Sequence, residues 1–96
     1  MLTASPPNTS ASGSTVTLTA AATCPGTPTY KFWIKAPGGD WTVVQDYSAS
    51  NTLGWTNTSS PINTTTQGTY YIEVDVRDQG GTDTYESVNN VIYVLS

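Results

Sequence analysis

A chain of 96 residues can bury one modest hydrophobic core and leaves no room for a second domain. Only 10% of the residues are charged and the formal net charge is −4, so the Lys/Arg-rich surface that nucleic acid requires is missing. The chain has no histidine, which excludes Ser/His and Cys/His nucleophile systems. No apolar run approaches the roughly 18 residues of a membrane-spanning helix, so no membrane insertion is expected.

All the elements that the sequence predicts are β-strands, because no segment shows the 3.6-residue period of a helix. A short strand over residues 2–5 ends at two prolines, and residues 8–14 are predicted to be a polar loop. Apolar residues alternate from residue 15 to 24, which predicts a half-buried strand. Residues 24–28 contain two prolines and a glycine and are predicted to be a turn.

The middle of the chain predicts a hairpin. Two strands, over residues 30–35 and 41–45, flank residues 37–40, whose Pro-Gly-Gly-Asp sequence is typical of a hairpin loop. A pairing that sets Phe32 beside Val44 also brings Trp33 near Val43 and Trp41 near Lys35.

Three more strands complete the predicted fold. They cover residues 52–56, 69–77 and 84–95, and Asn89-Asn90 in the last of them suggests a β-bulge. Seven strands with turns at this spacing favour a two-sheet sandwich over a barrel or an open sheet. The residues predicted to fill its core are Val16, Leu18, Ala20, Phe32, Ile34, Val44, Leu53, Trp55, Tyr70, Ile72, Val74, Val76, Val91 and Tyr93.

Two segments carry a resemblance to a known group of domains. They are Tyr30-x-Phe32-x-Ile34, followed by Gly38-Gly39-Asp40-Trp41, and Gly68-x-Tyr70-Tyr71-x-x-Val74-x-Val76-x-Asp78. Over about residues 14–95 the chain resembles the bacterial immunoglobulin-like and fibronectin type III-like modules, including the three-tyrosine type. The resemblance implies a seven-stranded immunoglobulin-like β-sandwich with Tyr70 as its corner tyrosine. It also implies that residues 1–96 are a single domain excised from a larger multidomain protein.

The core disulfide of antibody-type domains is not expected. Alignment with those domains puts Ala20 and Ile72 where the two core cysteines would lie, so an apolar pair fills the slot. The chain has one cysteine, Cys24, and therefore no internal disulfide. Because no histidine or basic cluster near it would lower its pKa, Cys24 is expected to be an unreactive, partly buried thiol.

Catalysis and metal binding find little support in the sequence. A glycosidase needs two carboxylates across a cleft, but Glu73 and Asp75 alternate outward on a strand whose other face is core. We interpret them as part of a solvated face and expect no enzyme. The turn from Asp78 to Asp83 carries two carboxylates beside glycines, but it matches no defined calcium loop. No metal and no cofactor are predicted, and a weak calcium site in this turn stays open.

The aromatic residues give the sharpest binding hypothesis. If Phe32 and Ile34 face inward, alternation sends Lys31, Trp33 and Lys35 outward together. An exposed tryptophan beside polar groups can stack on a sugar ring or anchor a partner. Two other interpretations stay open. Immunoglobulin domains bury a tryptophan on the corresponding strand, and the lysine stems can lie along the indole as an inert surface.

The sequence therefore predicts a non-catalytic module of a secreted or cell-surface bacterial protein, which serves as a structural spacer or a protein-interaction and adhesion unit. Its expected partners are neighbouring domains of the same chain or a surface protein. The alternative is a carbohydrate-binding module that holds a polysaccharide with the ligand-binding candidates Trp33, Trp41, Lys31 and Lys35. A row of exposed aromatic rings favours the alternative, and Trp33 buried between the sheets favours the spacer.

Overall fold

The computed structural model describes residues 2–21, 28–78 and 87–96, and within them it is all-β, without a helix. Cys24 and the residues that follow Asp78 in the predicted turn lie outside the described residues. In the part that is described, no helix is long and apolar enough to cross a membrane.

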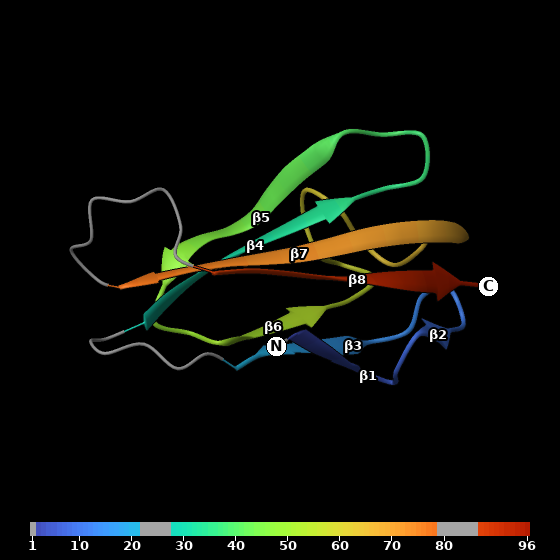
Figure 1. Ribbon diagram of the computed structural model, residues 1–96. Coiled ribbons are helices and arrows are strands. Elements are labelled where there is room, and N and C mark those ends of the chain that lie inside the picture. Colours follow the sequence, from blue (N-terminus) through green and yellow to red (C-terminus); the bar gives the residue numbers. More distant parts are fainter. Residues whose placement is uncertain (1, 22–27, 79–86) are drawn as a thin grey trace.

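The strands form two sheets that pack face to face as a β-sandwich (Figure 1). One sheet has three strands in the order β1-β3-β6, and the other has five in the order β2-β8-β7-β4-β5. Every pairing is antiparallel except the short parallel pairing of β2 with β8. The strands are β1 (Leu2–Ser5), β2 (Thr9–Ser10), β3 (Val16–Ala20), β4 (Pro28–Lys35), β5 (Trp41–Ser48), β6 (Thr52–Trp55), β7 (Gly68–Asp78) and β8 (Ser87–Leu95).

The predicted polar loop over residues 8–14 is wrong at β2, so the described residues form eight strands rather than seven. Here the chain leaves the smaller sheet and joins the edge of the larger one. The N–H of Val94 donates to Asn8 O at 2.9 Å, and that of Ser96 donates to Ser10 O at 3.0 Å. The residues of β2 are polar, Thr9 and Ser10, so no apolar alternation reveals the strand in the sequence.

Two other local predictions were also wrong. Pro28 belongs to β4, as its first residue opposite Asp78, rather than to a turn; the first position of a strand tolerates proline. The predicted bulge at Asn89-Asn90 is absent, because β7 and β8 pair without a register shift along their whole described length.

The irregularity lies in the β4–β5 hairpin instead. Trp33 pairs with Val43 and Lys35 with Trp41, as predicted. Phe32, however, pairs with Gln45 rather than Val44, because the register shifts between Phe32 and Trp33. A second shift follows between Tyr30 and Phe32. Since the two shifts together displace the strands by two residues, side chains beyond them keep their faces.

The core between the sheets follows the predicted alternation closely. Three predicted core residues, Val44, Leu53 and Val91, are only partly buried, and Val44 is the residue displaced at the first shift. The sequence analysis missed three buried residues near strand ends, Leu2, Tyr30 and Leu95. The full set of buried apolar residues is Leu2, Val16, Leu18, Ala20, Tyr30, Phe32, Ile34, Trp55, Tyr70, Ile72, Val74, Val76, Tyr93 and Leu95.

Trp55 forms the aromatic centre of this core. Its indole meets the rings of Tyr70 and Tyr93 edge-on, at centroid distances of 4.9 and 5.9 Å. The hydroxyl of Tyr70 donates a hydrogen bond to Thr66 O at 2.7 Å, and burial raises the pKa of this tyrosine. Ala20 and Ile72, the pair aligned with the missing disulfide, are both buried.

Candidate functional site

The outer face of the five-stranded sheet, turned away from the core, carries large side chains in rows that cross four strands. We call this surface the outer face. At a strand spacing of about 4.8 Å, each row spans roughly 14 Å. The first row runs through β8, β7, β4 and β5 as Ile92, Tyr71, Lys35 and Trp41. The second row follows the same strands as Asn90, Glu73, Trp33 and Val43.

The outer face also holds all three basic residues of the chain, Lys31, Lys35 and Arg77. Each of them lies over an aromatic ring. Lys31 Nζ is 4.7 Å from the centroid of Trp33 and 5.5 Å from that of Tyr47. The guanidinium carbon of Arg77 lies 4.0 Å from the Tyr47 centroid. Cation–π attraction therefore orders the cations against the sheet.

The third basic residue, Lys35, contacts an aromatic ring of the first row. Lys35 Nζ is 5.7 Å from the ring centroid of Tyr71, its neighbour on β7. Tyr71 and Trp41, which flank Lys35 on either side, are each 42% exposed. The row thus offers two accessible rings separated by one lysine stem.

Asp75 is buried beneath this face, which corrects the prediction that it is solvated. Its side chain is only 6% exposed, and Trp33 Nε1 donates a hydrogen bond to its Oδ2 at 3.0 Å. The other oxygen, Oδ1, has no hydrogen-bond partner among the described residues. Alternation did predict that Asp75 points away from the core, but it could not predict the contact with the Trp33 indole or the burial of the carboxyl group.

Glu73, two residues before Asp75 on the same face of β7, is partly buried. Burial is the main cause that raises the pKa of Glu73, the neighbouring negative charge of Asp75 acts in the same direction, and together they bring this pKa to about 7. Around neutral pH the Glu73 carboxyl group is therefore protonated in a large fraction of molecules. A protonated carboxyl both donates and accepts a hydrogen bond.

A shallow hollow of about 240 Å³ lies on the outer face, lined by Trp33, Trp41 and Glu73. Trp33 is thus neither in the core nor fully exposed: one side of its ring faces Lys31, and its N–H is held by Asp75. The structure brings together all four ligand-binding candidates from the sequence, because Lys31 and Lys35 flank Trp33 on β4 and Trp41 pairs with Lys35.

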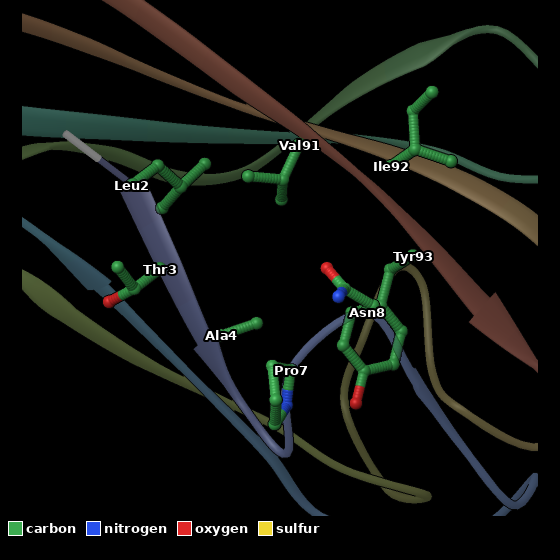
Figure 2. A pocket seen from close by; sticks show the side chains of 8 residues that line it. All are labelled: Leu2, Thr3, Ala4, Pro7, Asn8, Val91, Ile92 and Tyr93. Atoms are coloured by element: carbon green, nitrogen blue, oxygen red, sulfur yellow. The ribbon is translucent and has the colours of Figure 1, made fainter.

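A second hollow opens between β1 and β8, where the edges of the two sheets meet (Figure 2). It measures about 300 Å³. Leu2 and Ala4 of β1 face Val91 of β8 across it, and Pro7 and Asn8 close one end. No carboxyl, amine or thiol group is among the side chains that line it, so it offers little chemistry for a specific ligand.

A third hollow, of about 280 Å³, lies where the loop after β4 meets the segment before β7. Pro37, Pro61 and Ile62 line it together with Tyr70 and other residues. It contains no ionisable group except the Tyr70 phenol, whose hydroxyl is already bonded to Thr66.

Tyr47, Tyr71, Arg77 and Ile92 are among the residues of the outer face that sequence reasoning missed. For three of these four, the alternation along the strand could have predicted an outward position. Tyr71 and Arg77 share the odd-numbered alternation of Glu73 and Asp75, and Ile92 alternates with the predicted core residue Tyr93. Tyr47 had no such signal, because the two register shifts that bring it over Lys31 are not visible in the sequence.

The described residues contain no group of three His, Cys, Asp or Glu side chains arranged to hold a metal ion. Comparison of the chain with protein-family models, with curated proteins and with solved structures found no match.

Proposed function

We propose that this chain is a non-catalytic immunoglobulin-like module of a secreted or cell-surface bacterial protein, and that its outer face is the surface through which it binds a partner. One observation carries the proposal. All the large apolar side chains that are exposed in the described residues lie on this face: Trp41, Tyr71, Ile92 and Val94.

The immunoglobulin-like assignment draws support from the strand order and from one tyrosine. Three strands packed on a sheet that ends in a short parallel strand suit that family of sandwiches, as does Tyr70, whose hydroxyl reaches back four residues to a backbone carbonyl. The apolar pair Ala20 and Ile72 suits a member without the disulfide.

A binding role fits the outer face better than spacing alone. A spacer needs a soluble surface, and short Thr and Ser side chains supply it on the other sheet, where Thr17 of β3 is exposed. The outer face instead exposes rings and gathers every basic residue of an acidic chain. Clustered exposed apolar side chains commonly mark interaction sites.

The carboxyl groups of the outer face argue for a non-catalytic role. Glycoside hydrolysis needs two carboxyl groups on opposite sides of the bond that is cleaved. Glu73 and Asp75 are instead neighbours on one face of one strand, and Asp75 is buried beneath Trp33.

The proposal is tested by retention on bacterial surfaces. Protein labelled at its N-terminal amine is incubated with cell envelopes and with secreted polymers of Gram-positive and Gram-negative bacteria, and the sedimented fraction is measured. The double variant Lys35→Thr, Trp41→Thr alters the outer face, and Thr17→Ala is the matched control on the other sheet. We expect the wild type and the control to be retained and the double variant to be lost. Equal retention of all three proteins would place binding elsewhere on the module, and retention of none would leave only a spacer; either result contradicts the proposed role of the outer face.

A further inference from the structure

We infer that the partner of the outer face is a neutral carbohydrate and that the hollow between Trp33 and Trp41 holds one of its sugar rings. This inference rests on the proposed function, because it assigns a ligand class to the same surface. The walls of the hollow are two indoles and one carboxyl group, which together offer apolar contact and a hydrogen-bonding group at the same spot.

The two tryptophans have different roles in such a site. Trp41 is 42% exposed at the start of the edge strand β5, so its ring is free to stack on the apolar face of a sugar. Trp33 is fixed, since Lys31 lies over its ring and its N–H is bonded to Asp75 Oδ2. A fixed ring beside an accessible one is a preorganised arrangement that lowers the entropic cost of binding.

Glu73 supplies the group that forms a hydrogen bond with a sugar hydroxyl. Its carboxyl group lines the hollow and accepts a hydrogen bond from a sugar hydroxyl whether or not it is protonated. The same group argues against acidic sugars, because Glu73 and the buried Asp75 beneath it form a pair of acids at this spot. The nearby ammonium groups of Lys31 and Lys35 lie over aromatic rings of the sheet.

The size of the hollow sets the scale of the ligand. Its volume of about 240 Å³ is smaller than the roughly 300–1,000 Å³ of sites for drug-sized molecules, so it suits one ring. The row that begins at Trp41 continues over Lys35 to Tyr71 and Ile92, which gives further units of a chain a surface to lie on. An oligosaccharide running across the strands therefore contacts more of the face than a monosaccharide does.

The test is isothermal titration calorimetry at pH 6 with soluble hexasaccharides: cellohexaose, xylohexaose, maltohexaose and hexa-N-acetylchitohexaose as neutral probes, and hexagalacturonic acid as the acidic probe. We expect at least one neutral probe to bind with a dissociation constant on the order of 1 mM or tighter. Trp41→Ala should weaken that binding at least tenfold. Glu73→Gln, which keeps an accepting oxygen, should change it less than threefold, whereas Glu73→Leu should weaken it at least fivefold. Thr17→Ala is the control and should bind like the wild type.

The outcomes separate this inference from the proposed function. If no neutral probe binds, if the acidic probe binds more tightly, or if Trp41→Ala leaves the affinity unchanged, the inference is overturned. The proposed function survives that result when envelope retention still depends on the outer face and is abolished by protease treatment of the envelopes, which marks a protein partner. It fails together with the inference when envelope retention is also independent of the outer face.

Discussion

At the scale of single residues, the contact between Trp33 and Asp75 gives the outer face a fixed indole ring above a buried carboxyl group. A buried carboxylate is costly unless it is hydrogen-bonded, and the indole N–H provides one bond to Oδ2 at 3.0 Å. The neighbouring Glu73 adds a second acid, with a pKa raised to about 7. Such a pair weakens the fold when both groups are ionised, which points to a role for this spot other than stability.

The raised pKa makes stability depend on pH in a defined direction. Because Glu73 has a pKa of about 7 in the folded state against 4.5 for an unperturbed glutamate, the folded state binds the proton more tightly. The stabilisation is complete below pH 4.5 and is lost as pH rises through about 7. Glu73→Gln should therefore be more stable than the wild type by about 1 kcal/mol at pH 8, after discounting for partial exposure, and close to it at pH 5. Urea unfolding at the two pH values measures this, and an equal difference at both would contradict the assignment.

Tyr93 gives a second prediction at this scale, because its hydroxyl ties the crossing between the sheets to β8. It donates to Pro6 O at 2.6 Å and lies 3.1 Å from Ser10 Oγ. Tyr93→Phe leaves the Pro6 carbonyl without this partner and should lower the free energy of unfolding by about 1–2 kcal/mol. Tyr71→Phe, on the exposed outer face, is the control and should change it by less than about 0.5 kcal/mol. Chemical denaturation measures the free energy of unfolding of both variants. Equal decreases in the two variants would show that the hydrogen bond of the Tyr93 hydroxyl is not the cause.

At the scale of elements, the start of β7 depends on a glycine. Gly68 has a φ of +144°, and a Cβ built there would lie 2.5 Å from Pro37 Cγ. The ring of Pro37 belongs to the β4–β5 loop, so β7 can begin close to that loop only without a side chain at residue 68.

Gly68→Ala should therefore destabilise the protein by about 2 kcal/mol, through backbone strain and contact with Pro37. Gly54 of β6 is a matched control, since a Cβ there meets nothing within 4 Å and no positive φ is involved. Gly54→Ala should be neutral or stabilising by up to about 0.5 kcal/mol. Thermal unfolding of the two variants makes the comparison, and similar melting temperatures would refute the role given to Gly68.

The hairpin of β4 and β5 shows what the sequence could and could not predict. Alternation around Phe32 and Ile34 was enough to place Trp33 on the outer face, because a pleated strand has a fixed period of two. The two register shifts were not predictable, since no glycine, proline or other bulge signal marks residues 30–33 in the sequence. As a result the contact between Lys31 and Tyr47 was missed, and so was the burial of Asp75, which depends on the long-range contact with Trp33.

At the scale of the whole molecule, the two exposed sheet surfaces differ in character. The outer face of the five-stranded sheet carries the cations, the exposed rings and the carboxyl pair, whereas the residues that alternate outward on β3 are threonines. Packing of the core between the sheets does not require apolar side chains on the outer surface of either sheet. The asymmetry is what the proposed binding role of the outer face would produce, and the sequence predicted only the part of it that lies on β4 and at Trp41.

The most direct measurement of the central claim follows the indole N–H signals of the three tryptophans in a ¹H–¹⁵N correlation spectrum while a retained polymer, cut to soluble fragments, is added. Trp33 and Trp41 line the hollow of the outer face, and Trp55 is 1% exposed in the core and serves as an internal reference. The account predicts that the signals of Trp33 and Trp41 shift progressively and that the signal of Trp55 stays in place. Signals of Trp33 and Trp41 that stay in place, or a shift confined to Trp55, would contradict it.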